Sequence, residues 1–410
     1  MNNKVIYFLE THLGWLLCLL MDVFEKTIRL FSSTPSEHKA GQKVLFVKFI
    51  EQGALVLHRP AFAEAMSKYG QENVFICTFS SNAELLRLMN QFSPENLLLI
   101  DDKKLSGFIK DYFLSLKKIR QLNIDSVIDL EFFSRATALF CYMTGAEKRA
   151  GYHRFDGLQN YRGNLFTHRL SYSHYVHVAD SSLHLLRCLD LPKDTLPTFD
   201  QNQPSLLPLP RFTATAQDIN DLIQLTGIHD FAESKLIIIN PSLNDQLPLR
   251  QWPAENYLAL IARLQKNYTD HTIVLTGRKD EFEPTEVFAS KLDKSKTINL
   301  CGKTTFRQLL ALYSVSKAMV TSDSGPAHFA SLTDLPTVVL FGPETPELYG
   351  PTSQNALTIY LRLPCSPCFN VYNNRLSPCT NNLCMKNISV DSVAKSLYSL
   401  LDQSTVCKSN

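Results

Sequence analysis

The chain has 410 residues, of which 45% are hydrophobic and 20% are charged. This length predicts two domains of ordinary size, and the composition is that of a folded globular protein and argues against a disordered chain. The 41 basic and 39 acidic residues nearly balance, which does not favour nucleic acid as the main partner, and ten cysteines are too sparse for a disulfide scaffold.

The first segment, residues 1–42, combines an apolar stretch with a polar linker. Apolar side chains dominate from Val5 to Phe31, and their densest run, Leu13–Met21, is short of the roughly 20 residues that span a bilayer. No small-residue cleavage site follows this run, so it does not fit a secretory signal. It fits an amphipathic helix, and two alternatives stay open: the helix packs on the protein, or it lies on a membrane surface. Residues 32–42 are predicted to be a linker.

Strands and helices alternate after the linker. Strands are predicted at Lys43–Phe49, Val74–Phe79, Leu97–Ile100 and Ser126–Leu130, and helices at Pro60–Tyr69 and Ser106–Leu122. This alternation predicts parallel strands with crossover helices, and hence a Rossmann-like domain over residues 43–205. The stretch Gly145–His177 is rich in Tyr, His, Arg and Gly, and it is predicted to be irregular rather than part of the core.

A boundary with three prolines lies near Asp200–Arg211, and the same alternation then restarts. Strands are predicted at Lys235–Asn240, Thr272–Thr276, Thr297–Leu300, Ala318–Ser322 and Thr337–Phe341, and helices at Ala254–Asn267, Thr305–Ser314 and Pro326–Thr333. The pattern predicts a second Rossmann-like domain over residues 206–387, with an amphipathic helix and tail over residues 388–410. Two such domains are expected to enclose a cleft, with ligands beyond the carboxyl ends of the strands.

The turn Asp323–Gly325, between a predicted strand and a helix that starts at Pro326, is the most informative segment. Proline suits a first helical position, and the free N–H groups at a helix start favour an anion such as a diphosphate. Asp323 cannot favour phosphate, so it is expected to orient the turn or to accept from a sugar hydroxyl. The remaining side-chain donors here are Ser322, Ser324 and His328. The alternative is an ordinary strand, turn and capped helix without a ligand.

The segment SDSGPAHFAS (residues 322–331), followed by LPTVVLFGPETPELYGP (335–351), resembles the C-terminal motif of glycosyltransferase family 9, the heptosyltransferase-like enzymes. Other segments resemble that family in the same order: KVLFVKFIEQGALVLHRPAF (43–62), VIDLEFFSRATALFCYMTGAEKRAGYHR (127–154), IIINPSLNDQLPLRQWPAENYLAL (237–260), IVLTGRKDE (273–281) and NLCGKTTFRQLLALY (299–313). The resemblance runs over about residues 43–402. Several ordered motifs are far more specific than one.

The resemblance implies an inverting, metal-independent transferase with the GT-B fold, two Rossmann-like domains facing across a cleft. The C-terminal domain would hold a nucleotide-sugar donor, such as one resembling ADP-heptose, and the N-terminal domain the acceptor. No cofactor is implied. Arg250 matches the family's basic residue that contacts donor phosphate, and Trp252-Pro253 fixes this register.

The resemblance also assigns the rest of the donor site. The family's donor-contacting turn is matched by Ser322, Asp323, Ser324, Gly325 and His328. The donor site is also expected to include residues that end or follow neighbouring strands and so face the same cleft: Thr276, Gly277, Gly302, Lys303 and Thr304. The alternative for the threonines is helix capping, because Thr305 and Gln308 have the spacing of a capping box.

One position departs from the family pattern. The heptosyltransferases typically carry Gly-Asp after the first strand, and that aspartate is the expected base, whereas this chain has Gly53-Ala54. Alanine accepts no proton, and inverting displacement normally needs a base at the acceptor hydroxyl. Glu51 is the first replacement, Glu131 the second and Asp129 the third. Each has a structural alternative, for instance pairing with Arg135 or Arg149. The acceptor is expected to bind among residues 51–59 and 132–169, where aromatic and basic groups gather.

Four cysteines near the end, Cys365, Cys368, Cys379 and Cys384, have the spacing C-x2-C-x10-C-x4-C. Four thiolates are able to hold a structural zinc, but the second pair is wider than a usual zinc knuckle. Plain packing as reduced thiols is therefore the favoured interpretation, and neither alternative makes the cluster catalytic.

The sequence as a whole predicts a glycosyltransferase that builds lipopolysaccharide or another surface polysaccharide. Its partners would be a nucleotide sugar and a glycan or glycolipid acceptor, with no nucleic acid. The expected location is the cytoplasm, either free or peripheral on the inner face of the cytoplasmic membrane. Two alternatives remain open: a donor-binding pseudoenzyme that acts as a scaffold, which the missing aspartate motivates, and a nucleotide-sugar epimerase.

Overall fold

The computed structural model describes residues 13–31, 43–154, 161–198, 209–231, 235–244, 247–373 and 376–406. Its contacts divide the chain into two compact units, Met1–Leu209 and Pro210–Asn410, each with a sheet and a core of its own. The domain boundary expected at residues 205–206 lies outside the described residues.

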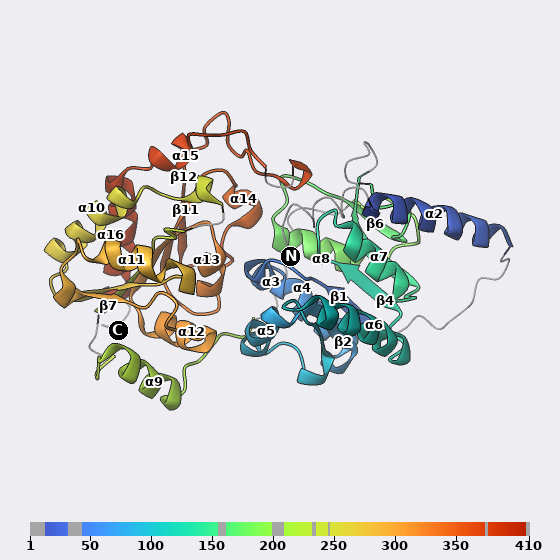
Figure 1. The fold of residues 1–410 in the computed structure, drawn as a ribbon, viewed down its shortest axis with the longest axis horizontal. Helices are drawn as coiled ribbons and strands as arrows, with labels where there is room; N and C mark the ends of the chain where they lie inside the picture. Colours follow the sequence, from blue (N-terminus) through green and yellow to red (C-terminus); the bar gives the residue numbers. More distant parts are fainter. Residues whose placement is uncertain are drawn as a thin grey trace. The chain divides into compact units, whose positions relative to one another are not determined.

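The N-terminal unit is built on a six-stranded sheet in the order β3-β2-β1-β4-β5-β6, which is the order of a Rossmann fold (Figure 1). Its strands are β1 (Val44–Val47), β2 (Val74–Phe79), β3 (Leu97–Ile100), β4 (Ser126–Asp129), β5 (Lys148–His153) and β6 (His168–Ser171), and all neighbours are parallel. The last residues of β1 and β4, Val47 and Asp129, are partners in the register. The loops after these two strands therefore start at the same level.

Helices cover both faces of this sheet. They are α2 (Gly14–Phe31), α3 (Gln52–Leu57), α4 (Arg59–Tyr69), α5 (Ala83–Met89), α6 (Leu105–Gln121), α7 (Arg135–Met143) and α8 (Val178–Cys188). Alternate strand residues face opposite helix layers. Leu45 belongs to a core cluster with side chains of α2, α6 and α7, whereas Phe46 meets Phe62 of α4 edge to face, with ring centroids 4.9 Å apart.

The expectation that residues 145–177 are irregular is wrong, because β5 and β6 lie within them. Tyr152 and Phe166 are buried, and a Cβ on Gly151 would stand 2.6 Å from the Phe166 ring. Arg149 adds to the polar character of this sequence, but it is buried, and its guanidinium donates to the carbonyls of Leu165 (2.6 Å) and Ala146 (2.7 Å). A buried charged residue with internal hydrogen bonds interrupts the pattern of apolar residues by which a strand is usually detected in the sequence.

The C-terminal unit repeats the same design, with a parallel sheet in the order β12-β11-β10-β7-β8-β9. Its strands are β7 (Lys235–Asn240), β8 (His271–Leu275), β9 (Thr297–Asn299), β10 (Ala318–Ser322), β11 (Thr337–Phe341) and β12 (Ala356–Tyr360). Its helices are α9 (Ala216–Thr226), α10 (Ala254–Asn267), α11 (Phe282–Ala289), α12 (Phe306–Val315), α13 (Gly325–Ala330), α14 (Pro346–Tyr349), α15 (Leu383–Lys386) and α16 (Val390–Val406). The predicted α/β class with two Rossmann-like units is confirmed.

The closing helix α16 is part of the core of the C-terminal unit. It contacts α10, β10 and β11, and its Leu397 and Leu401 are buried in the same cluster as Ile237 and Trp252. The indole of Trp252 donates to the Ile388 carbonyl (3.0 Å) just before α16. The segment after residue 387 therefore completes the second sheet domain rather than standing beside it.

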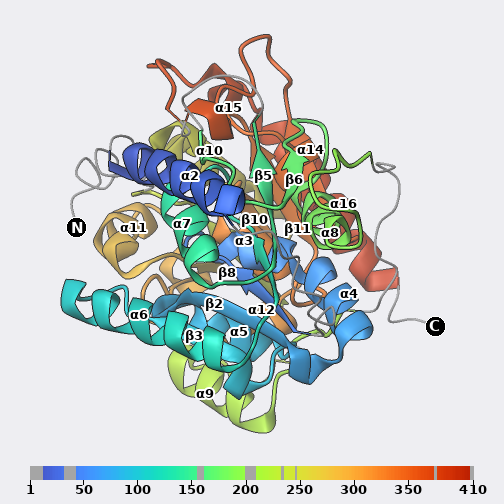
Figure 2. The ribbon, with the colours of Figure 1, turned by 90° about the vertical axis from the view of Figure 1, so that its right-hand side faces the viewer.

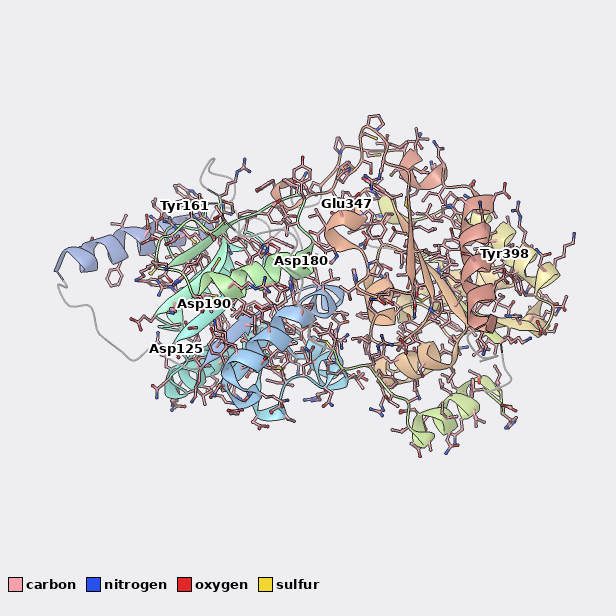
Figure 3. The ribbon with its side chains drawn as sticks, turned by 180° about the vertical axis from the view of Figure 1, so that it is seen from behind. Asp125, Tyr161, Asp180, Asp190, Glu347 and Tyr398 are labelled. Atoms are coloured by element: carbon pink, nitrogen blue, oxygen red, sulfur yellow. The ribbon has the colours of Figure 1, made fainter. Side chains whose placement is uncertain are left out.

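Helix α2 packs on the N-terminal unit along one side. Cys18 is fully buried in the core, and buried Asp22 accepts from the Asn164 backbone N–H (3.2 Å) and the Tyr161 hydroxyl (3.3 Å). Figure 3 shows Tyr161 beside this helix, and its ring also meets that of Trp15, with centroids 6.4 Å apart. Among the helices in the described ranges, none is both long enough and apolar enough to cross a membrane.

Candidate functional site

The carboxyl ends of the C-terminal unit's strands form a polar edge around Asn240, the last residue of β7. The Asn240 amide donates to the Thr276 carbonyl (2.8 Å) after β8, and its oxygen accepts from the Ser242 hydroxyl (2.8 Å). The same oxygen lies 3.5 Å from the hydroxyl of Thr321 on β10. All four side chains are buried, so polar groups of three adjacent strands meet where open α/β sheets bind ligands.

The turn after β10 lies at the same edge. The Asp323 N–H donates to the Leu340 carbonyl (2.9 Å), and the Ser324 hydroxyl donates to the Ser322 carbonyl (3.1 Å), which together hold the turn against β11. The Ser322 hydroxyl is fully buried and makes no hydrogen bond to any residue that the structure describes. A buried hydroxyl without a protein partner costs free energy unless a ligand or water pairs with it.

Helix α13 is shorter than the sequence predicts, since it ends at Ala330 rather than near residue 333. A helix of this length has a small dipole, so anion binding here would depend on individual N–H groups and hydroxyls. Gly325 has a packing role, because a Cβ there would stand 3.1 Å from the Phe329 ring. His328 is buried within the helix.

The loops after β8 and β9 are joined by their backbones. The N–H of Gly302 donates to the carbonyl of Gly277 (2.9 Å), so the two expected donor-binding turns lie together. Lys303 is exposed, with its ammonium 4.7 Å from the centre of the Phe282 ring, and Thr304 follows it. The capping box at Thr305 and Gln308 is present in both directions. Capping thus involves Thr305, whereas Thr276 hydrogen-bonds to Asn240.

Arg250 ends a short helical turn, Pro248–Arg250, and is half-buried. Its neighbour Gln251 donates to the Ser242 carbonyl (2.8 Å), which holds this turn beside the end of β7. The Trp252 side chain is buried and contacts the Tyr257 ring edge to face, so it fixes the turn to the core of the C-terminal unit. The register that the Trp-Pro pair implied therefore places Arg250 near the strand-end edge.

Sequence reasoning missed Asn240, Ser242, Thr321 and Glu344 at this edge. Asn240 donates to the Thr276 carbonyl after β8, the Thr321 hydroxyl of β10 lies 3.5 Å from the Asn240 oxygen, and Ser242 donates to Asn240 at the end of the strand before it. Glu344, three residues after β11, is a buried carboxylate. The signal was present in Asn240-Pro241-Ser242, because polar residues directly after an apolar strand mark the carboxyl edge of a parallel sheet.

In the N-terminal unit, Glu131 is fully engaged. One of its oxygens accepts from the backbone N–H groups of Phe49 (2.8 Å) and Ile50 (2.9 Å), and the other from buried Lys48 (2.8 Å). These bonds join the loop after β1 to the loop after β4. The second candidate base therefore holds the backbone of the first candidate's loop in place.

Asp129, the third candidate base, is fully buried. Its carboxylate accepts from Arg162 (2.6 Å) and from the Thr137 hydroxyl (2.9 Å). Burial raises the pKa of Asp129 to about 6, against the opposing effect of Arg162. The ion pair is with Arg162, not with Arg135 or Arg149, the two arginines weighed from the sequence. This arrangement leaves no open side for an acceptor hydroxyl.

Glu51 differs from both, because its side chain is about a third exposed and lies 3.8 Å from Lys48. Its backbone is left-handed, with φ 65° and ψ 80°, at the N-terminus of α3. A non-glycine residue in this region is strained and needs its surroundings to hold it there, and such residues gather at functional sites. The hydrogen bonds from Phe49 and Ile50 to Glu131 supply that restraint.

His58 is a further polar group that sequence reasoning missed in this region. It is fully buried, and neither ring nitrogen hydrogen-bonds to any described residue. Burial, followed by the charge of Lys48, holds its pKa well below the usual value, and the charge of Glu51 opposes this effect. Lys48, Glu51 and His58 thus form one polar cluster after β1.

The C-terminal cysteines show no common ligand geometry. In the parts of the chain that the structure describes, no group of three or more His, Cys, Asp or Glu side chains is placed to hold a metal ion. Burial and the nearby thiols of Cys368, Cys379 and Cys365 raise the pKa of Cys384 to about 11. Cys384 packs against Gly342, where a Cβ would stand 3.1 Å from its sulfur, so this cysteine serves packing.

Two parallel sheets of Rossmann order, one with a polar strand-end edge, are the architecture of the GT-B fold. The same fold is seen in E. coli ADP-heptose lipopolysaccharide heptosyltransferase II, with a TM-score of 0.68 and 20% identity over 88% of this chain and 99% of that one. E. coli heptosyltransferase WaaC, solved with ADP, has a TM-score of 0.60 and 14% identity, with 87% and 99% covered.

The sequence model of glycosyltransferase family 9 (heptosyltransferase) matches residues 114–377, so the chain belongs to this family. The lipooligosaccharide heptosyltransferase 2 of Campylobacter jejuni is 27% identical over 172 residues, which are 42% of this chain and 52% of the relative. The chain thus spans about half the length of the curated relatives it matches, or less.

Proposed function

We propose that this protein is an inverting heptosyltransferase. It transfers a heptose or related sugar from a nucleoside-diphosphate donor, of the ADP-heptose type, to a glycan or glycolipid acceptor in lipopolysaccharide or lipooligosaccharide synthesis. Family membership supports the reaction class, and the names of its relatives support the sugar and the pathway. The observation that carries the proposal is the buried polar edge of the C-terminal unit, where Ser322 has a hydroxyl without a described partner.

The donor diphosphate would lie at this edge. The hydroxyls of Ser322 and Ser324 and the N–H groups of the turn would donate to its oxygens, and Arg250 would bind them bidentately. Thr276, Gly277, Gly302, Lys303 and Thr304 would contact the nucleoside side, with Asp323 accepting from a sugar hydroxyl and His328 adding a donor. Donors placed before the reaction stabilise the charge that grows on the leaving diphosphate, at roughly 3–4 kcal/mol for each one removed.

Glu51 would be the base. The acceptor oxygen attacks the anomeric carbon from the face opposite the diphosphate, its proton passes to the Glu51 carboxylate, and the carbon–oxygen bond to the diphosphate breaks. Lys48, 3.8 Å away, would pair with this carboxylate before the reaction. Glu131 would act as a positioning residue, since its oxygens are occupied by Lys48 and two backbone N–H groups.

The acceptor of this pathway is linked to lipid, so we further propose that the protein works at the inner face of the cytoplasmic membrane. Peripheral association would bring the acceptor loops after β1 and β4 to substrates that do not leave the bilayer.

The test is nucleotide release from a panel of ADP-, GDP-, UDP- and CMP-sugars, with and without extracted glycolipid acceptor. We expect one donor, of the ADP-heptose type, to stabilise the protein and to be consumed only with acceptor. Glu51→Gln should lower kcat about 10²- to 10⁴-fold while donor-induced thermal stabilisation is unchanged. Glu95→Gln, at an exposed glutamate, is the matched control and should keep full activity.

Three outcomes would count against the proposal. Tight donor binding without turnover for any acceptor would indicate a scaffold. Sugar conversion without acceptor would indicate an epimerase. Absence of binding to all nucleotide sugars, in protein that unfolds cooperatively, would show that the donor site is not at the strand-end edge of the C-terminal unit.

A further inference from the structure

Helix α2 presents an apolar face on the side that does not pack on the protein. Leu16, Leu20, Val23 and Phe24 of the helix, and Leu13 directly before it, are each 45–55% exposed, at a spacing that puts them on one side. Cys18 and Asp22, on the other side of the same helix, are buried. A row of large apolar side chains in water is unfavourable, and such a face marks a binding surface.

Helix α6 carries a second exposed apolar row, and this row is flanked by lysines. Leu105, Ile109, Phe113 and Leu114 are 49–64% exposed, and Lys110, Lys117 and Lys118 are exposed beside them. Residues 103–122 hold six basic side chains and one acidic, Asp111, whose carboxylate turns inward to accept from the Asp101 N–H (3.1 Å). The outer side of α6 is therefore both apolar and positively charged.

The two rows belong to one helix layer. Helix α2 packs on α7, and α7 meets α6 through the rings of Phe140 and Tyr112 (5.1 Å) and a bond from Arg120 to the Met143 carbonyl (2.6 Å). Figure 2 shows α2, α7 and α6 side by side over one face of the N-terminal sheet. On the surface between α6 and α7 lies an open hollow of about 530 Å³, lined by Phe113, Leu116, Lys117, Arg120, Gln121 and Met143.

We propose that this outer surface, formed by the exposed apolar residues of α2 and α6 with Lys110, Lys117 and Lys118, docks on a bilayer that contains anionic phospholipids. The apolar side chains would enter the boundary between headgroups and acyl chains, while the lysines contact headgroup phosphates. The open hollow would accept a lipid headgroup at Lys117 and Arg120. The inference deepens the proposed function, because it assigns the surface that would bring the enzyme to a lipid-linked acceptor.

Charge favours an anionic bilayer over a second copy of the chain as the occupant. A symmetric dimer through the same surface would bring the lysines of the two copies together, and like charges that face each other oppose association. An anionic lipid surface complements both the apolar and the basic part of this layer.

The test is sedimentation of the full chain with vesicles of phosphatidylcholine, with and without phosphatidylglycerol. We expect binding to the anionic vesicles that weakens with salt. The triple change Leu16→Gln, Leu20→Gln and Phe24→Gln should weaken binding about tenfold or more to any vesicle. The triple change Lys110→Gln, Lys117→Gln and Lys118→Gln should remove the preference for anionic vesicles and its salt dependence.

A matched control changes Lys266→Gln, Lys291→Gln and Lys294→Gln, exposed lysines of the C-terminal unit, and should bind as the wild type. All changes are at exposed positions, and cooperative thermal unfolding checks that each variant folds. Thermal stabilisation by ADP and turnover of a water-soluble acceptor fragment should be unchanged, so failure of docking is distinguishable from failure of the proposed function.

Three results would overturn the docking proposal. They are no binding of the wild type to anionic vesicles, equal binding of all variants, and a dimer in sedimentation velocity that the α2 variant converts to a monomer.

Discussion

At the scale of single residues, His58 couples the polar cluster after β1 to pH. It is buried beside Lys48, with Glu51 and His177 also acting on it, and burial is the largest cause of its lowered pKa. In the unfolded chain a histidine takes up a proton near pH 6.5. The folded protein accepts this proton only at lower pH, so protons favour the unfolded state and the free energy of unfolding falls as pH drops below about 6.5.

We expect this loss of stability to be smaller in His58→Leu. The difference in slope should approach about 1.4 kcal/mol per pH unit, the value for one proton. Urea unfolding of both proteins between about pH 7.5 and about pH 5.5 measures it. Other histidines with lowered pKa, such as His153 at about 4, act in the same direction, so part of the slope remains. Identical slopes would mean that His58 takes up its proton at the same pH in the folded protein as in the unfolded chain.

At the scale of elements, the loops at the carboxyl edge of the C-terminal sheet approach each other too closely for side chains. Gly302 follows β9 with φ 66°, and a Cβ there would stand 2.4 Å from the backbone Cα of Lys279 in the loop after β8. Gly227, at the end of α9, has a similar φ of 73° but nothing within 4 Å of its Cβ position. A substitution at Gly227 therefore introduces backbone strain alone, whereas one at Gly302 adds a steric clash to the same strain.

Gly227→Ala should cost about 1 kcal/mol, the price of a left-handed alanine. Gly302→Ala should cost clearly more, because the loop after β8 must also move, and it should weaken donor binding by shifting Thr276 and Gly277. Thermal unfolding of both variants, followed by titration with ADP, tests this. Equal stability of the two variants and unchanged ADP binding would show that the loop after β8 moves aside without affecting stability or the nucleotide.

At the scale of the whole molecule, each unit has its own sheet and its own buried cluster. The polar strand-end residues from Asn240 to Glu344 all belong to the C-terminal unit, and α16 closes the core of that unit. A unit with a complete core is expected to fold without its neighbour.

Residues 209–410 expressed alone should therefore unfold cooperatively and retain stabilisation by ADP, whereas residues 1–209 should show no such stabilisation. Differential scanning calorimetry with and without ADP makes the comparison. A C-terminal fragment that fails to unfold cooperatively would mean that its core depends on the N-terminal unit. A folded fragment that ignores ADP would mean that the nucleotide needs residues before 209.

The sequence by itself determined the family and nine of the twelve strands in the described residues, because β5, β6 and β12 were not predicted. Runs such as Val74–Phe79 and Ala318–Ser322 match β2 and β10 because strands buried on both faces are mostly apolar, with polar residues near their carboxyl ends. The ordered motifs led to glycosyltransferase family 9 because several segments resemble that family in the same order, and local sequence carries such motifs. Residues 145–177 escaped prediction because Arg149 finds its partners only in the folded protein.

Only the tertiary structure decided which carboxylates are already engaged. Glu131 and Glu51 are the same residue type, each in a loop after a strand, and the sequence does not show which carboxylate is hydrogen-bonded. In the structure Glu131 binds Lys48 and two backbone N–H groups some 80 positions earlier in the chain. Asp129 is neutralised by Arg162, 33 residues away. The two faces of α2 are likewise distinguished only by what packs on them. Hydrogen bonds and burial between distant residues determine these roles, and a linear pattern carries no information on such distances.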